Sequence, residues 1–177
     1  MSNVTLPIAG GHSDQGPNRQ ANQDALFVEP ARSPAMQSGA LYMVADGVGG
    51  QQMGDEASKI AVQVIPQSYY QLRQQPDTTI QQALLRAFEQ ANSAINHRAR
   101  ELALKKMRTT AVTAVIFEGK LYLAHAGDAR AYLLRGHGGS GSLQRLTKDH
   151  SWVQEQVDAG VIPEKDVAKL KGRLGTL

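Results

Sequence analysis

Residues 109–126 read TTAVTAVIFEGKLYLAHA, and this stretch indicates the fold class. Two runs rich in apolar and β-branched residues stand on either side of Glu118 and Gly119, a pair suited to a tight turn. Such a pattern is typical of a β-hairpin. Other short apolar runs, bounded by turn-forming residues, predict more strands, namely ALFV at 25–28, ALYMVA at 40–45, RAYLLR at 130–135 and SLQRLT at 142–147.

From Met53 the sequence changes to long segments that predict two helices, separated by a break at 75–78. Pro66 is the one punctuating residue inside the first of them. In the second, apolar residues recur at spacings of three, four or seven and predict one buried stripe, made of Ile80, Leu84, Ala87, Phe88, Ala91, Ile95 and Leu102.

A third, short helix is predicted over 151–159, with Asp149 or Ser151 near its start and Gly160 just past its end. The order of elements is then strands, two helices and strands again. This order indicates an α+β fold with antiparallel sheets whose faces are covered by helices, rather than alternating β and α units.

The composition bounds the class of protein. The 177 residues, 41% of them hydrophobic and 20% charged, suffice for one domain with its own core. The absence of cysteine excludes disulfides, cysteine nucleophiles and thiolate metal sites, so a metal would bind to oxygen or imidazole. No apolar run is long enough to span a bilayer, and the N-terminus lacks a signal-peptide pattern. We expect a cytoplasmic protein with no membrane partner.

Two further features suggest other kinds of ligand. Lys105, Lys106 and Arg108 form the longest basic run, but without interleaved aromatic residues they are interpreted as a solvated helix end, not a nucleic-acid site. The loop GHGGSGS at 136–142 lacks the lysine and following Ser or Thr of a phosphate-binding P-loop. It is interpreted as a flexible hairpin tip.

Three aspartates stand beside predicted strand ends and close to glycine. Asp46 follows an apolar strand and opens DGVGG, Asp24 precedes ALFV, and Asp128 follows KLYLAHAG. Glycines let the backbone approach a bound ion, and the carbonyl of Gly47 is a candidate ligand. Each aspartate is also explained as a turn residue bonded to its own backbone. Arg19 is either an ion partner of these carboxylates or a fork for an oxyanion such as phosphate.

Four strings then occur in an order that resembles the metal-dependent serine/threonine protein phosphatases of type 2C, in a bacterial-type form. They are DQGPNRQANQD at 14–24, MVADGVGGQQMGDEAS at 43–58, TTAVTAVIFEGKLYLAHAGDARAYLLR at 109–135 and LTKDHSW at 146–152. The resemblance covers nearly the whole chain. It implies two stacked antiparallel β-sheets flanked by helices, an αββα sandwich, over a single phosphatase-like domain at 1–177.

The resemblance also implies a function and a site. The function is hydrolysis of phosphoserine and phosphothreonine in proteins by a metal-activated water at a centre of two Mn²⁺ or Mg²⁺ ions. Asp46 would bridge both ions, the Gly47 carbonyl would bind one, and Asp24 would contact metal directly or through water. Asp128 would belong to a weaker third metal position, and Arg19 would hold the substrate phosphate. The partners would be phosphorylated proteins, substrates of a serine/threonine kinase.

The sequence departs from the family pattern in three places. Gln23 stands where many relatives have glutamate, and Val48 where many eukaryotic relatives have a histidine proposed as general acid. None of the five histidines has an evident catalytic spacing. After 175 the late S-D-G and D-N motifs, each with a metal-binding aspartate, are absent, and the corresponding C-terminal strands are missing.

Three explanations of the missing motifs are open: a fragment of a larger phosphatase, a naturally shortened product, or a regulatory module. The first two are favoured because Arg19, Asp24, Asp46 and Asp128 are all present. The alternative function is a catalytically silent phosphatase-fold module that binds phosphoproteins or a partner. Asp55 and Asp149 are the spare carboxylates that would complete a site within these 177 residues.

Overall fold

The computed structural model describes residues 7–31, 33–48, 53–136 and 141–163, together with 165 and 167. The chain divides into two compact units, Met1–Ala129 and Arg130–Leu177. The first holds a sheet with two long helices, and the second a hairpin with a short helix. Within the described residues, two antiparallel sheets and three α-helices confirm the predicted α+β fold.

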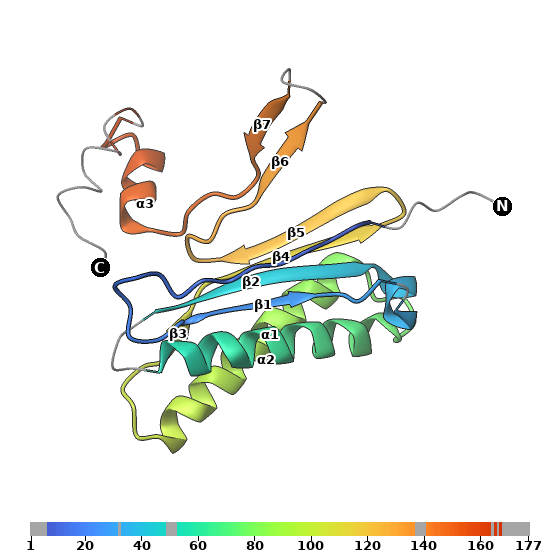
Figure 1. The fold of residues 1–177 in the computed structure, drawn as a ribbon, viewed down its shortest axis with the longest axis horizontal. Helices are drawn as coiled ribbons and strands as arrows, with labels where there is room; N and C mark the ends of the chain where they lie inside the picture. The colour runs from blue at the N-terminus through green and yellow to red at the C-terminus, as the bar shows by residue number, and fades with distance from the viewer. Residues whose placement is uncertain are drawn as a thin grey trace. The chain divides into compact units, whose positions relative to one another are not determined.

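The sheet of the first unit is antiparallel throughout, with its strands in the order β1-β2-β4-β5 (Figure 1). A short strand, β3, pairs with the end of β2. The predicted hairpin at 109–126 is confirmed: Phe117 pairs with Lys120, and positive φ angles at Glu118 and Gly119 fit the two-residue turn that right-twisted strands favour. The bounds are β1 Asp24–Val28, β2 Ala40–Val48, β3 Arg108–Thr109, β4 Ala111–Phe117 and β5 Lys120–Ala126.

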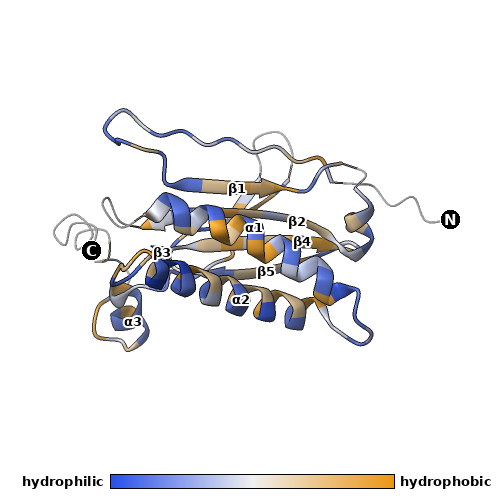
Figure 2. Ribbon diagram, turned by 90° about the horizontal axis from the view of Figure 1, so that it is seen from below, coloured by the Kyte–Doolittle hydropathy of each residue, from blue (hydrophilic) through white to orange (hydrophobic). Residues whose placement is uncertain are grey.

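Two helices, α1 Gly54–Arg73 and α2 Ile80–Glu101, lie side by side on one face of this sheet (Figures 1 and 2). A 3₁₀ helix, η1 Pro34–Ser38, connects β1 to β2. The start of α2 is fixed by a capping box, in which Thr79 and Gln82 satisfy each other's backbone N–H groups. These caps and the break at 75–78 explain why the two helices separate where the sequence predicted.

The hydrophobic core lies between these helices and one face of β2. Leu41, Met43 and Ala45 of β2 are buried, whereas Val44 and Val48 are exposed, so the strand alternates as a sheet with one covered face requires. The predicted stripe of α2 is largely confirmed, with Ile80, Leu84, Ala87, Ala91 and Ile95 buried and Phe88 packed against them. Leu102 is the wrong member: it follows the end of α2 and is 36% exposed.

A polar cluster joins α1 to the sheet at the end near η1. Tyr70 donates a hydrogen bond of 2.6 Å to the buried carboxylate of Glu29, and its hydroxyl oxygen accepts one from the backbone of Leu41. Tyr69 donates to the carbonyl of Ser38 at 2.6 Å. Burial, and then the Glu29 carboxylate, raises the pKa of Tyr70. The phenol therefore stays protonated and donates its hydrogen bond to Glu29.

The second unit contains β6 Tyr132–Arg135, β7 Ser142–Arg145 and α3 Trp152–Asp158, close to the predicted ranges. Ser151 is the cap of α3, accepting a hydrogen bond from the backbone of Gln154, and Gly160 follows the helix. Residues 137–140, the core of the glycine-rich tip, lie outside the described residues. Among the residues that are described, no helix is long and apolar enough to cross a membrane.

The first turn of α1 touches the end of β2 through two glycines. A Cβ added at Gly47 would lie 2.0 Å from the carbonyl oxygen of Gly54 and 2.7 Å from that of Gln23. A Cβ added at Gly54 would lie 2.8 Å from the carbonyl carbon of Gly47. Only glycine fits at both positions, because backbone atoms on each side leave no room for a side chain.

We predict that Gly47→Ala destabilises the protein by about 1–3 kcal/mol, since the new methyl group forces α1 away from β2. Urea unfolding monitored by circular dichroism measures the loss. Gly10→Ala is the matched control, because nothing lies within 4 Å of its added Cβ. Equal unfolding midpoints for the two variants would show that the Gly47–Gly54 contact is not tight in solution.

Candidate metal centre

Two carboxylates face each other across neighbouring strands at one end of the sheet. Asp24 is the first residue of β1, and the register pairs it directly with Asp46 of β2. Directly opposite residues share a face of the sheet, with Cβ atoms about 4.5–5.5 Å apart, and like charges there are destabilising. Both residues are exposed, on the face that α1 and α2 leave uncovered. The pair therefore has its charges directed to solvent and close together.

The environment of Asp46 is short of positive charge. Although the residue as a whole is exposed, partial burial of its carboxyl group is the largest cause that raises its pKa, followed by the charge of the Asp24 carboxylate and a hydrogen bond with it. The charge of Asp128 raises the pKa further, and only Arg19 lowers it. A carboxylate in this position gains from a cation that neutralises it.

The backbone of Asp46 is held on its other side by two threonines. Thr110 donates its N–H to the Asp46 carbonyl at 2.8 Å, and its side-chain oxygen accepts the N–H of Asp46 at 3.2 Å. The Thr109 hydroxyl donates to the same carbonyl at 3.0 Å. The expectation that Asp46 opens a loop is wrong: β2 continues through Gly47 to Val48, because β3 supplies further pairing.

Gly47 is also fixed from the β1 side. Its N–H donates to the carbonyl of Gln23 at 3.0 Å, one residue before Asp24. The two strands therefore remain bonded up to the paired carboxylates. Residues 49–52, which complete the DGVGG motif and its continuation, lie outside the described residues.

The loop before β1 forms a pocket of about 290 Å³ against Asp46. Asn22 shapes it: its side-chain oxygen accepts the N–H of Asp24 at 3.0 Å, and its amide donates to Ser13 at 2.8 Å. Asp14 closes a turn by accepting the N–H of Gly16 at 2.7 Å. The sequence analysis did not single out Asn22, although an asparagine two residues before Asp24 is a recognisable turn signal.

Arg19 and Asp128 complete the group predicted from the sequence. Arg19 lines the same pocket as Asp24 and Asp46, and its charge acts on Asp46. Asp128 follows β5, and its charge reaches Asp46 as well. The preceding Gly127 has φ +94 and packs on Thr110, where a Cβ would lie 2.7 Å from the threonine methyl carbon. Ends of separate strands are thus brought together around Asp46.

Other acidic groups are already engaged. Asp55 forms an ion pair of 2.9 Å with Lys59, and the buried Asp149 accepts two hydrogen bonds from Arg130, at 2.9 and 2.5 Å. Both spare carboxylates named from the sequence, Asp55 and Asp149, are therefore already paired with cations. Within the described parts of the chain, no group of three or more His, Asp or Glu side chains is arranged to hold a metal ion by itself.

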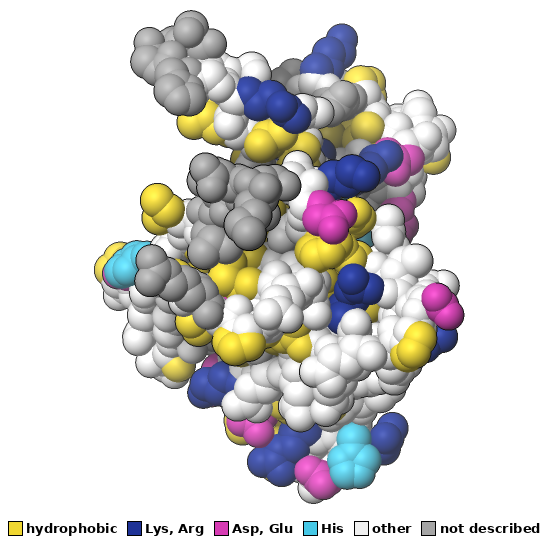
Figure 3. All heavy atoms as spheres, turned by 90° about the vertical axis from the view of Figure 1, so that its right-hand side faces the viewer, with side chains coloured by type: hydrophobic (Ala, Val, Ile, Leu, Met, Phe, Trp, Pro, Cys, Tyr) yellow, Lys and Arg dark blue, Asp and Glu magenta, His cyan; other side chains and the backbone are white. Residues whose placement is uncertain are grey.

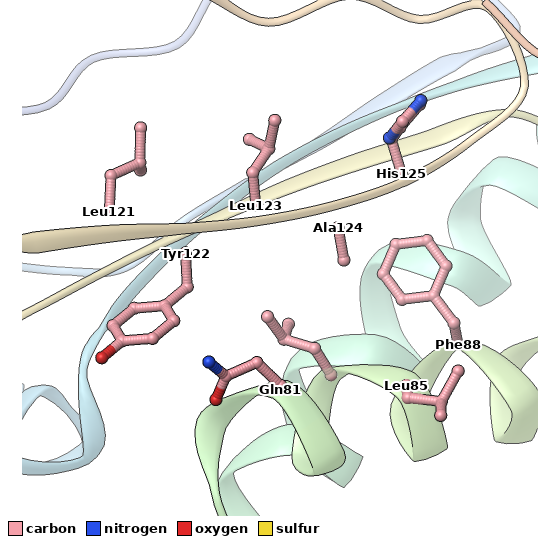
Figure 4. A pocket seen from close by; sticks show the side chains of 9 residues that line it. Gln81, Leu85, Phe88, Leu121, Tyr122, Leu123, Ala124 and His125 are labelled. Carbon is pink, nitrogen blue, oxygen red and sulfur yellow. The ribbon is translucent and has the colours of Figure 1, made fainter. Parts of the chain in front are cut away.

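A second hollow has a different character. A groove of about 430 Å³ lies between α2 and the last strand of the sheet, β5. Its lining is mostly apolar, and Figure 4 shows Tyr122 and Ala124 pointing toward the helix while Leu121, Leu123 and His125 point the other way. No carboxylate among the described residues lines this groove.

On the molecular face in Figure 3, acidic side chains are scattered among basic ones. The pocket beside Asp46 is the better candidate site.

Comparison with known sequences places this geometry in a family. The family described as protein phosphatase 2C matches residues 9–156. The serine/threonine phosphatase Stp of Listeria monocytogenes is 32% identical over 164 residues, 87% of this chain and 59% of the relative. The serine/threonine protein phosphatase PstP of Mycobacterium tuberculosis is 34% identical over 169 residues, 93% of this chain and 30% of the relative.

Solved structures agree in fold. The catalytic domain of PstP in complex with two manganese ions has a TM-score of 0.67 and 32% identity, covering 88% of this chain and 61% of that one. A Streptococcus agalactiae serine/threonine phosphatase has a TM-score of 0.71 and 28% identity, covering 89% and 62%. The chain spans about three fifths of the length of these structures. The four motifs, the fold and these matches agree, and the chain belongs to the protein phosphatase 2C family.

Proposed function

We propose that this chain carries the phosphate-binding and part of the metal-binding half of a protein serine/threonine phosphatase. The observation that carries the proposal is the register pair Asp24–Asp46, with Arg19 in the same pocket. Two adjacent carboxylates attract divalent cations, and a guanidinium beside them suits an anionic phosphate. Family membership supports the proposal, because relatives of this chain are named serine/threonine phosphatases.

The residues present fit Mn²⁺ or Mg²⁺. The candidate ligands are all oxygen atoms, which hard divalent cations prefer, and the charges of Asp24 and Asp128 act on Asp46 against the single charge of Arg19. Asp46, Asp24 and the Gly47 carbonyl would hold two ions, and Asp128 a weaker third. When bound, such ions neutralise phosphoryl oxygens and lower the pKa of a water molecule. The remaining ligands must come from solvent or from groups outside the described residues.

The chain's own side chains have separable roles in this proposal. Arg19 binds the phosphate through its guanidinium fork and orients it toward the carboxylates. Asn22 and Thr110 are positioning residues, because each holds the backbone of an aspartate by hydrogen bonds. No histidine is among the described residues that line the pocket, and Val48 stands where many eukaryotic relatives have a histidine. The leaving group would then take its proton from solvent.

The matches extend across both compact units, which supports the proposal that residues 1–177 form part of one phosphatase-like domain. Its substrates would be phosphorylated proteins, the products of a serine/threonine kinase.

The activity is tested by Mn²⁺-dependent release of phosphate from phosphoserine and phosphothreonine peptides, with a phosphotyrosine peptide for comparison. We expect phosphate release from the phosphoserine and phosphothreonine peptides, and we expect chelation of the metal to abolish this release. Release equal to that of the Asp46→Asn variant would contradict catalysis by this chain. Retained phosphopeptide binding in that case would indicate a binding module instead.

Asp46→Asn should abolish Mn²⁺ binding, because the substitution removes the negative charge of the carboxylate that both ions would contact, while it keeps the shape of the side chain. Isothermal titration with Mn²⁺ measures the loss. In the presence of a chelator the variant should be at least as stable as the wild type, since the repulsion from Asp24 is relieved.

Asp77→Asn is the matched control for this experiment. It makes the same charge change at an exposed turn residue with φ +62, a conformation that asparagine tolerates well. Mn²⁺ affinity that is unchanged in Asp46→Asn, or lowered equally in both variants, would reject the assignment of Asp46.

Arg19→Ala should weaken binding of inorganic phosphate in the presence of Mn²⁺ by about tenfold, the effect of losing about 1.5 kcal/mol of charge-assisted hydrogen bonding. Arg86→Ala removes an exposed arginine from α2 and is the control. Mn²⁺ affinity itself should not fall in either variant, because removing a nearby cation does not weaken cation binding. Equal phosphate affinities in the wild type and Arg19→Ala would exclude the phosphate role.

A further inference from the structure

Arg108 lies on the same sheet face as the paired carboxylates. Strand β3 pairs Arg108 with Val48 and Thr109 with Gly47 at the end of β2. Cross-strand partners share a face, and so do residues two apart along a strand. Arg108, Val48 and Asp46 are therefore on one face, with Asp24 on the other side of Asp46. At this end of the sheet Asp24 of β1 and Arg108 of β3 flank β2 from opposite sides, with Asp46 between them.

The segment that leads to Arg108 is anchored at both ends. Helix α2 ends at Glu101, and the next turn is closed by Ala103 with φ +52 and by a 2.9 Å hydrogen bond from the Leu104 N–H to the Ala99 carbonyl. Leu104 packs against the core, and Met107 is buried. Lys105 and Lys106, between these two anchors, are exposed.

The cations Lys105, Lys106 and Arg108 are exposed, as interpreted, but their assignment to a helix end is wrong. Lys105 and Lys106 belong to a fixed loop, and Arg108 belongs to a strand. We call Lys105, Lys106 and Arg108 the basic patch.

The basic patch has no neutralising partner among the described residues. Its acidic neighbours in the fold are already paired: Glu56 and Glu101 with Arg98 at 3.1 Å each, and Asp55 with Lys59 at 2.9 Å. None of the three cations of the patch forms an ion pair within the described part of the chain. An uncompensated positive charge at Arg108, on the face of the paired carboxylates, attracts an anionic partner, and Lys105 and Lys106 precede it in the chain.

The spacing fits a polypeptide substrate. Two residues along β2 and one step across to β3 put the Cα atoms of Asp46 and Arg108 about 8 Å apart. An extended peptide advances about 3.3 Å per residue, so a phosphorylated residue held at the carboxylates has its neighbours two to four positions away beside the patch.

We propose that the basic patch binds acidic side chains that flank the phosphorylated residue, so that this chain prefers phosphopeptides with Asp or Glu two to four positions away. The proposal rests on the proposed function, because it places the phosphorylated residue at Asp24, Asp46 and Arg19. A protein substrate is favoured over a nucleic acid, because the patch contains no aromatic side chain on which a base could stack.

Four fluorescent peptides test the proposal: with serine or a non-hydrolysable phosphonate analogue of phosphoserine at the centre, and with glutamate or glutamine at positions two to four on both sides. Fluorescence anisotropy measures their binding to the 177-residue chain in Mn²⁺. The acidic phosphopeptide should bind about five to ten times more tightly than the neutral one, as expected for a few exposed ion pairs. This advantage should shrink as salt is added.

The double variant Lys106→Ala/Arg108→Ala should lose most of the advantage of the acidic flanks and keep the advantage of the phosphate. Arg86→Ala/Lys120→Ala, with the same net charge and both sites exposed, should keep both advantages. Replacement of Arg108 by lysine, R108K, should retain most of the effect because the charge is conserved. Unchanged unfolding midpoints confirm that the variants are folded.

Each outcome is distinct. Equal affinity for acidic and neutral phosphopeptides, or an equal loss in both double variants, overturns the patch while leaving the phosphate site supported. Equal affinity for the phosphorylated and unphosphorylated acidic peptides overturns the proposed phosphate site, and with it the substrate role of the patch. Tighter, patch-dependent binding of a single-stranded oligonucleotide overturns the proposal in favour of nucleic acid.

Discussion

The end of strand β2 is paired on both sides, and the candidate site depends on this double pairing. On the β1 side, Asp24 pairs with Asp46 and the carbonyl of Gln23 accepts the N–H of Gly47. On the other side, Thr109 pairs with Gly47 and Thr110 donates its N–H to the Asp46 carbonyl. An unsupported strand end would let the aspartate turn away from its partner. Because both flanks are bonded, the backbone of Asp46 is fixed and its carboxylate is held opposite that of Asp24.

Carboxylates at the two ends of the sheet lie in different environments. Glu29 is buried near η1 and accepts a hydrogen bond from Tyr70, so its contribution is structural. At the other end Asp24 and Asp46 face each other, and burial, followed by the charge of Asp24, raises the pKa of Asp46. This second arrangement costs stability, since like charges repel and gain nothing from folding alone. A cost of this kind is understandable where a cation or a substrate supplies the missing charge.

Local signals explain which elements the sequence analysis predicted correctly. The hairpin at 109–126, the break between α1 and α2 and the Ser151 cap all rest on residues close together in the chain. One error came at the end of a helix, and another where distant segments meet. Leu102 fits the helical spacing of α2 but lies beyond its end, and Asp46 remained in β2 because β3, about 60 residues later, extends the pairing.

The sequence by itself determined the family and the chemical types at the site: carboxylates beside glycines, an arginine, and no sulfur ligand. Only the tertiary structure decided that Asp24 faces Asp46 in register, that Asn22 and Thr110 hold them, and that Arg108 shares their face. The physical reason is that strand register pairs residues far apart in the chain, such as Val48 with Arg108, and local residue patterns do not specify such pairing.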